Sequence, residues 1–216
     1  MNYIIIPAYN EGSRIRTVVR EAKKHSKNIV VVDDGSTDTT AAVAKRAGAV
    51  VLQHIINLGK GAAMKTGAEY ALSKKATNLV FLDGDGQHKP NDVPVFLRAL
   101  KKHDIVFGQR KRSKNMPFVR RFGNWLIAFT VKNIYDMHLE DCICGYRAFT
   151  ANAYKKLRWK SRAYGVECEM IARAGKHNLS YASIPVATIY LDKHKGMTIF
   201  DGIRVMFYLI WWRMTH

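Results

Sequence analysis

A pair of aspartates in the segment LVFLDGDGQHKP, residues 79–90, is the strongest chemical signal in the chain. Asp83 and Asp85 follow an apolar run, and on an extended segment side chains two residues apart point to the same side. Their oxygens, with Gln87 next on that side, suit Mg²⁺ or Mn²⁺, which prefer oxygen ligands and often bridge to substrate phosphates. Gly84 would let the backbone approach a ligand closely. A glycine-rich turn without a ligand is the alternative, because an aspartate pair of this spacing is a weak motif alone.

Polar residues also follow other apolar runs, in the segments PAYNEG, DDGS and NLGKG. The side chains there with ligand-binding chemistry are Tyr9, Glu11, Asp34 and Lys60. A ring can pack on a base, a carboxylate can accept hydrogen bonds from a base or a ribose, and a lysine at a helix start can meet an anion. Helix caps and ordinary loops are the alternative explanation. The spacing of a Walker P-loop is absent, and no GxGxxG follows the first strand, which counts against those nucleotide-binding motifs.

The elements that must position these residues alternate regularly in the first half of the chain. Strands are expected at 3–9, 28–35, 49–54, 77–83 and 104–110, and helices from about 15 to 22 and at 36–48, 60–75 and 91–103. Valine-rich runs without alternation are typical of strands buried on both faces. The order predicts right-handed βαβ units and a mainly parallel sheet with helices on both faces. The ligand-bearing strand ends then meet at one edge, where open α/β sheets bind ligands.

The pattern changes after the fifth strand, where the basic loop RKRSKNMPFVRR occupies residues 110–121. The elements expected beyond it are a helix from about 118 to 133, strands within 144–149 and 181–191, and a final helix at 198–216. There is no internal repeat and no clear interdomain linker. We therefore expect one α/β domain at 1–197 and a C-terminal helix at 198–216.

The composition narrows the partners. The 216 residues include 35 Lys and Arg against 17 Asp and Glu, a formal net charge of +18. Such a surface favours nucleic acid, an anionic membrane face or phosphorylated substrates. Nucleic-acid binding predicts aromatics among the basic residues and needs no aspartate pair, so the carboxylates at the predicted cleft argue against it. Cys142, Cys144 and Cys168 indicate reduced thiols rather than a disulfide framework.

Together the motifs resemble those of glycosyltransferase family 2, the nucleotide-sugar-dependent enzymes of the GT-A fold. The nearest resemblance is to the dolichyl-phosphate mannose synthases and the polyprenyl-phosphate glucosyltransferases. The matching segments span roughly residues 3–170 in the family's order; they are IIIPAYNE, IVVVDDGSTDTT, NLGKGAAMKTG, LVFLDGDGQHKP, IVFGQR, DCICGYRAF and YGVECEM. The QxxRW signature of processive polysaccharide synthases is absent, which disfavours a polymerising enzyme.

The resemblance also implies a role for each matching residue. Those expected to bind the nucleotide are Pro7, Ala8, Tyr9, Glu11, Asp34, Lys60, Asp83 and Gly84. Those expected to hold Mg²⁺ or Mn²⁺ against the diphosphate are Asp83, Asp85 and Gln87. Those expected to meet the acceptor phosphate are Arg110, Arg120, Arg121, Arg147 and Lys195. Those expected at the reacting centre are Asp85, Arg110 and Asp141. The segment KHKGMT, which contains Lys195, departs from the arginine and GxSK pattern of the relatives.

The resemblance implies transfer of a hexose from a nucleotide-diphosphate sugar, and the acceptor decides the rest of the chemistry. A polyprenyl or dolichyl phosphate is already anionic near pH 7 and needs cationic positioning rather than a strong base. A hydroxyl of a soluble or lipid-linked glycan would need a carboxylate base, for which Asp141 is the candidate. One displacement predicts inversion at the anomeric carbon. The donor stays open among GDP-mannose, UDP-glucose and UDP-N-acetylhexosamine.

The C-terminal segment TIFDGIRVMFYLIWWRMTH combines an apolar, aromatic run with Arg204 and Arg213. The run is too short to span a membrane, which takes about 20 apolar residues. Aromatics beside arginines are typical of an amphipathic interfacial helix, and the basic loop would face the same anionic surface. A helix docked on the sheet or on a dimer partner is the alternative. We expect a peripheral protein at the cytoplasmic side of the cell membrane.

Overall fold

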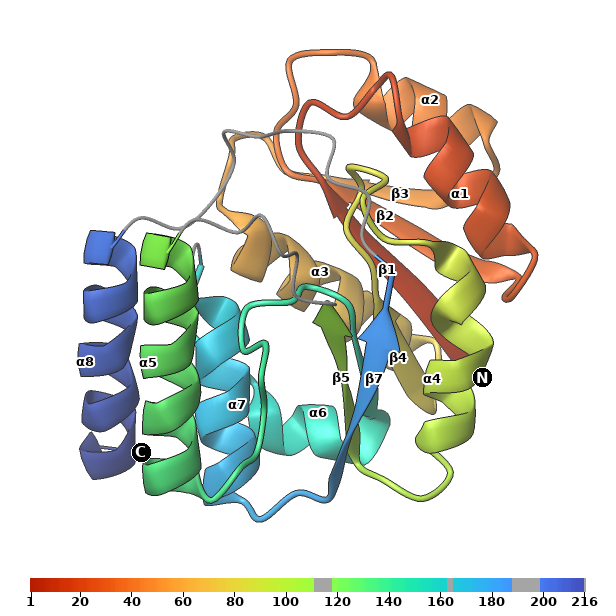
Figure 1. Cartoon of the computed structure of the whole chain (residues 1–216). Helices are drawn as coiled ribbons and strands as arrows, with labels where there is room; N and C mark the ends of the chain where they lie inside the picture. The colour runs from red at the N-terminus through yellow and green to blue at the C-terminus, as the bar shows by residue number, and fades with distance from the viewer. Residues whose placement is uncertain (111–117, 163–164, 188–198, 216) are drawn as a thin grey trace.

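The computed structural model describes residues 1–110, 118–162, 165–187 and 199–215. Within these residues one seven-stranded sheet carries helices on both faces (Figure 1). The strands are β1 (Asn2–Ala8), β2 (Asn28–Asp33), β3 (Val50–Gln53), β4 (Asn78–Phe81), β5 (Ile105–Arg110), β6 (Arg147–Thr150) and β7 (Tyr181–Val186). The helices are α1 (Ile15–Lys23), α2 (Thr40–Arg46), α3 (Lys60–Ser73), the short 3₁₀ helix η1 (Pro90–Asp92), α4 (Val93–Ala99), α5 (Phe118–Tyr135), α6 (Ala151–Leu157), α7 (Val166–Lys176) and α8 (Ile199–Thr215). The expected α/β class is confirmed.

The strands lie in the order β3-β2-β1-β4-β6-β5-β7. Neighbours are parallel except at β6, which pairs antiparallel with both β4 and β5. The parallel part follows from the βαβ units, whose crossover helices return the chain to the same end of the sheet. The mainly parallel sheet expected from the sequence is therefore confirmed, with β6 as its antiparallel member.

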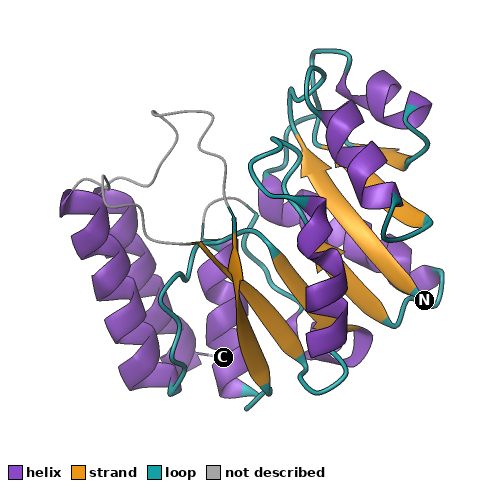
Figure 2. Ribbon diagram, turned by 45° about the vertical axis from the view of Figure 1, so that its right-hand side comes forward, coloured by secondary structure: helices purple, strands orange, loops and turns teal. Residues whose placement is uncertain are grey.

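The two faces of the sheet are covered by different sets of helices (Figure 2). Ile5 of β1 packs in a core with α3 and α5 to α8, whereas Ile4 and Ile6 pack in a second core with α1, α2 and α4. Successive residues of a strand point to opposite faces, so each buried strand feeds both cores. This explains why the strands read as unbroken apolar runs.

The C-terminal helix α8 belongs to the core of the domain. It packs against α5 and α7 and runs beside α5 (Figure 1). Val205 and Leu209 are buried there, and the Tyr135 hydroxyl donates a hydrogen bond to the Leu209 carbonyl. The helix is thus docked on the domain through one face, and contact of its exposed face with a membrane stays a prediction. In the described part of the chain, no helix is both long and apolar enough to cross a membrane.

Candidate active site

The loops that follow β1, β2 and β4 meet at the carboxyl edge of the sheet. The Asn10 N–H donates to Ser36 Oγ at 2.9 Å, which joins the first two loops. A β-carbon added at Gly84 would lie 3.1 Å from the Pro7 carbonyl oxygen and 3.2 Å from Ala8 Cβ. The structure therefore brings Pro7, Ala8 and Gly84 together, as a shared nucleotide-binding role requires.

Tyr9 and Glu11 differ in solvent exposure. The side chain of Tyr9 is exposed at the edge of the sheet. Glu11 is buried, and its carboxylate lies 3.1 Å from the Arg14 guanidinium while its backbone N–H donates to Thr40 Oγ1. Tyr9 thus remains available to a base, whereas Glu11 also holds the start of α1.

Asp34 is a buried support of the neighbouring loop. Its Oδ1 lies 2.7 Å from His54 Nδ1 and accepts the Leu58 N–H at 2.9 Å, and its Oδ2 accepts the Gly59 N–H at 2.8 Å. The residue is only 3% exposed. The carboxylate fixes the loop that leads to Lys60, and its contact with the nucleoside stays a prediction.

The aspartate pair does not lie on an extended segment. The chain turns at Gly84 and Asp85, Gly86 has a φ of 75°, and Asp85 Oδ1 accepts the Gln87 N–H at 2.9 Å. The expectation that a two-residue repeat aligns Asp83 with Asp85 is wrong, because glycine conformations bend the backbone there. Asp83 instead forms an ion pair with Lys60, whose Nζ lies 2.7 Å from its Oδ1.

The donor atoms at this turn fit a divalent cation in their chemistry. Asp83, Asp85 and Gln87 are all half-buried, and all offer hard oxygen atoms. Among the described residues no group of three His, Cys, Asp or Glu side chains gathers as a protein-only metal centre. Mg²⁺ and Mn²⁺ need no such group, since they bind through one or two carboxylates together with water and substrate phosphates.

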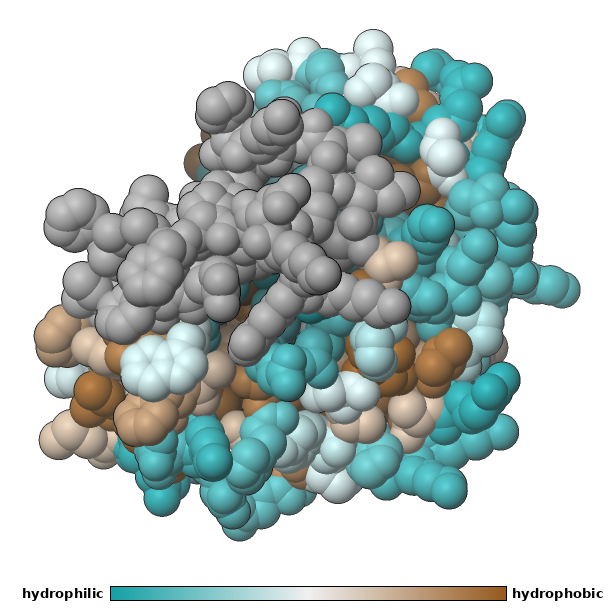
Figure 3. Space-filling view, in the orientation of Figure 1, coloured by the Kyte–Doolittle hydropathy of each residue, from teal (hydrophilic) through white to brown (hydrophobic). Residues whose placement is uncertain are grey.

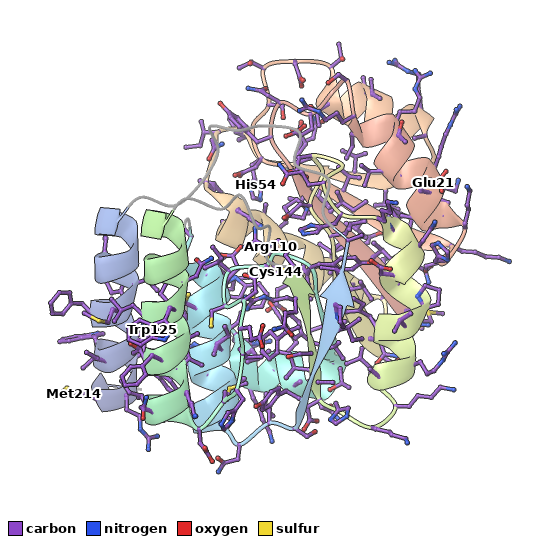
Figure 4. All side chains as sticks on the ribbon, in the orientation of Figure 1. Glu21, His54, Arg110, Trp125, Cys144 and Met214 are labelled. Atoms are coloured by element: carbon purple, nitrogen blue, oxygen red, sulfur yellow. The ribbon has the colours of Figure 1, made fainter. Side chains whose placement is uncertain are left out.

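Arg110 and Asp141 form a bidentate ion pair. Arg110 Nε donates to Asp141 Oδ2 at 2.6 Å, and Nη2 donates to Oδ1 at 2.9 Å. Burial alone would raise the pKa of Asp141, but the hydrogen bonds and charge of Arg110 hold that pKa below its usual range. Figure 4 shows Arg110 at the end of β5 beside Cys144. Two of the three residues expected at the reacting centre, Arg110 and Asp141, are thus brought together, with the carboxylate ionised.

Arg147 has a structural role in the core. It is fully buried, and its guanidinium donates to the carbonyl oxygens of Cys142, Cys144 and Glu167. In this enclosed position its donors satisfy backbone carbonyls, and the expected contact with an acceptor phosphate stays a prediction. The arginine ties the 142–147 segment to the start of α7.

The remaining expected acceptor residues fall outside what the structure describes. The side chains of Arg120 and Arg121, at the start of α5, and the whole of Lys195 are not among the described atoms. The same holds for residues 111–117 of the basic loop. Their contact with a phosphate stays a prediction.

Residues that the sequence analysis assigned no role complete the cluster around Asp83. Glu167 Oε1 lies 3.0 Å from Lys60 Nζ, and His88 Nδ1 lies 3.6 Å from Asp83 Oδ2. A β-carbon at Gly145 would lie 2.5 Å from Asp83 Oδ2 and 2.6 Å from Lys60 Nζ. The only sequence signal was their presence in segments that matched the family, which did not indicate contact with Asp83.

An apolar surface lies on the outer side of α5 and α8 (Figure 3). Its exposed side chains are Trp125, Phe129, Phe207, Tyr208, Ile210, Trp211 and Met214. Figure 4 places Trp125 on α5 and Met214 near the end of α8. We call these residues the α5–α8 surface.

Solved structures share this architecture. Glucosyl-3-phosphoglycerate synthase from Mycobacterium tuberculosis, crystallised with Mn²⁺, uridine diphosphate and glucosyl-3-phosphoglycerate, aligns with a TM-score of 0.74. The alignment covers 100% of this chain and 79% of that chain at 18% sequence identity. The fold is thus the GT-A fold, with the carboxylate cluster at the carboxyl edge of its sheet.

The family follows from the sequence comparisons. A family model described as glycosyl transferase family 2 matches residues 3–158. An uncharacterised protein of Methanocaldococcus jannaschii is 37% identical over 96% of this chain and 90% of its own length. A UDP-N-acetylglucosamine–dolichyl-phosphate N-acetylglucosaminyltransferase of Methanococcus voltae is 30% identical over 98% and 96%. An undecaprenyl-phosphate mannosyltransferase of Micrococcus luteus is 28% identical over 92% and 86%. The chain belongs to glycosyl transferase family 2 and is a glycosyltransferase.

Proposed function

We propose that the protein transfers a hexose, with inversion, from a nucleotide-diphosphate sugar to a polyprenyl or dolichyl phosphate. Mg²⁺ or Mn²⁺ would be its cofactor, and the cytoplasmic face of the cell membrane its place of action. The named relatives from Methanococcus and Micrococcus support the acceptor class, since both names specify polyprenyl-type phosphates. The donor stays among GDP-mannose, UDP-glucose and UDP-N-acetylhexosamine.

The ion pair between Arg110 and Asp141 is the observation that carries the choice of acceptor. A hydroxyl acceptor needs a general base whose pKa lies near the working pH. Asp141, the candidate for that role, is held by two hydrogen bonds from Arg110, and its pKa is lowered. A phosphate acceptor brings its own negative charge, so a weakly basic Asp141 favours the phosphate over the glycan hydroxyl.

On the donor side, Asp83, Asp85 and Gln87 would hold the divalent ion. The ion would stabilise the negative charge that develops on the leaving diphosphate. Tyr9 would pack on the base, and Pro7, Ala8 and Gly84 would line the nucleotide. Lys60, at the first turn of α3, would keep a positive charge beside the diphosphate.

On the acceptor side, Arg110 would meet the phosphate, with Asp141 fixing the direction of the guanidinium. Arg120, Arg121 and Lys195 would add positive charge for the phosphate. The α5–α8 surface would rest on the lipid headgroups, because aromatic side chains favour the membrane interface. Such a contact brings the lipid phosphate to the enzyme without a membrane-spanning helix.

The test is incubation of the purified protein with each labelled nucleotide sugar, Mn²⁺ or Mg²⁺, and two acceptors of equal chain length. One acceptor is the polyprenyl phosphate and the other is the free polyprenol. We expect label in a phosphate-linked glycolipid only, lost on chelation and in the Asp85→Ala variant. Transfer to polyprenol or to a soluble glycan would favour the hydroxyl alternative. Salt-dependent nucleic-acid binding without sugar transfer would overturn the proposal.

A further inference from the structure

The ammonium of Lys60 is shared between carboxylates from two different elements. Its Nζ lies 2.7 Å from Asp83 Oδ1, just beyond β4, and 3.0 Å from Glu167 Oε1, in the first turn of α7. Burial opposes the charge, but the carboxylates of Asp83 and Glu167 together raise the pKa of Lys60 above its ordinary value. One cation therefore bridges a predicted metal ligand and a carboxylate outside the predicted metal site.

The backbones that carry Lys60 and Glu167 are both anchored. The Gly61 N–H donates to the Arg162 carbonyl at 2.7 Å, and Trp159 Nε1 donates to the Gly61 carbonyl at 2.8 Å. On the other side, Arg147 donates to the carbonyl of Glu167 itself. The distance between the two backbones is thus set by the fold, and only the side chains are left to adjust.

A divalent cation at Asp83 conflicts with the present position of the ammonium. Both positive charges would contact the same carboxylate, and like charges at that distance repel strongly. The ammonium occupies Oδ1 of Asp83, so a cation that binds this oxygen displaces the ammonium, and a cation on Oδ2 binds against its charge. Glu167 already contacts the ammonium at 3.0 Å, so it is the carboxylate placed to keep Lys60 in the site.

We propose that Glu167 is a positioning residue that takes over the Lys60 ammonium when Asp83 binds the divalent cation. This inference rests on the proposed metal-dependent transfer. Without Glu167 the ammonium stays on Asp83 and competes with the metal. With Glu167 the lysine leaves Asp83 but remains beside the diphosphate, where its charge assists the departure of the nucleotide.

Loss of Glu167 and loss of Lys60 should change the affinity for a divalent cation in opposite directions when donor and acceptor are absent. Titration of the full chain with Mn²⁺, followed by electron paramagnetic resonance or calorimetry, measures the affinity directly. We expect Glu167→Gln to weaken Mn²⁺ binding by about tenfold and Lys60→Met to strengthen it by a similar factor, the size of ordinary couplings between sites. In the double variant, Glu167→Gln should have little further effect, because the residue that it positions is gone.

The double variant separates positioning from a general effect of negative charge. If Glu167 acted only by attracting the cation with its negative charge, Glu167→Gln would weaken Mn²⁺ binding equally with and without Lys60. That result would overturn the inference. Unchanged affinity in Glu167→Gln would overturn it too. Glu140→Gln, at an exposed position, is the matched control and should leave the affinity unchanged.

Asp85→Asn tests the metal site itself. If this variant binds Mn²⁺ as tightly as the unmodified protein does, the proposed cofactor site is wrong, whatever the role of Glu167. Circular dichroism checks the folding of each variant.

Discussion

Arg110 and Asp141 meet in a bidentate ion pair, with the backbone N–H of Arg110 also 3.2 Å from Asp141 Oδ2. The carboxylate comes from the segment before β6 and the arginine from the end of β5, 31 positions earlier in the chain. Three donors from one residue therefore direct the guanidinium and keep the acid ionised. This relationship is the structural observation that supports the proposed phosphate acceptor.

The pair predicts a pH dependence of stability. The pKa of Asp141 is lowered from the ordinary 3.8, so its stabilising contribution is present above that value and is lost as the pH falls through the lower folded pKa. Asp141→Asn should cost about 1–3 kcal/mol of the free energy of unfolding at pH 7. Urea unfolding measured at pH 7 and in acid should show the difference from the unmodified protein shrinking at low pH. Exposed Asp136→Asn is the control, and a constant difference between the two pH values would contradict the prediction.

Arg147 is expected to matter for folding and not for acceptor binding. Arg147→Met leaves three carbonyls without their donor in the core and should cost about 3 kcal/mol or more of the free energy of unfolding. Arg158→Met, at a 58% exposed side chain, should change it by less than about 0.5 kcal/mol. Urea denaturation of both variants makes the comparison. Normal stability with a raised KM for the acceptor would restore Arg147 as a phosphate ligand.

Asp34 is expected to act through the loop that it holds. Asp34→Ala removes the acceptor of the Leu58 and Gly59 amides, and hydrogen bonds to a charged group contribute about 1.5–3 kcal/mol each. Amide hydrogen exchange at Leu58 and Gly59 should therefore accelerate. Asn57→Ala removes only a neutral bond to the same Gly59 N–H, at 3.0 Å, and should have a smaller effect. Unchanged exchange in Asp34→Ala would show that other contacts fix the loop.

Gly145 is expected to be essential for the arrangement of Asp83 and Lys60. Gly145→Ala places a β-carbon 2.5 Å from Asp83 Oδ2 and 2.6 Å from Lys60 Nζ, so both charged groups must shift. Displacement of catalytic groups by about 1 Å can reduce a rate about 100-fold, and sugar transfer should fall to that extent. Gly123→Ala on α5 meets nothing within 4 Å and should leave transfer intact. Equal sugar-transfer rates in Gly145→Ala and Gly123→Ala would contradict the predicted displacement of Asp83 and Lys60.

The cysteines are expected to be inert in the folded protein. Burial raises the pKa of Cys142 and Cys144 to about 12, and burial also raises the pKa of Cys168 well above its ordinary value. Thiolates are the reactive form, so iodoacetamide at pH 8 should not label the native chain. All three cysteines should be labelled after unfolding in urea. Mass spectrometry counts the adducts, and fast labelling of the native protein would refute their burial.

Much of the fold was determined by the local sequence pattern. Valine and isoleucine runs such as IVVVD predicted β2 and its neighbours, because a strand buried on both faces needs apolar residues at every position. The alternation with helices then placed the ends of β1, β2 and β4 at one edge. The segment with Asp83 and Asp85 was identified by its place after an apolar run, whereas Arg110 and Asp141 were identified through the resemblance to family motifs.

Tertiary structure alone decided what each of these side chains does. Asp34, Asp83 and Arg147 were all predicted to be ligand residues, and only the structure shows that Asp34 holds a loop, Asp83 pairs with Lys60 and Arg147 is enclosed in the core. Glu167 contacts Lys60 because the N-terminal ends of α7 and α3 lie next to each other in the fold. The sequence by itself determines which charged groups are present. The packing decides which of them are buried and paired, because burial and pairing depend on groups that are far apart in the chain.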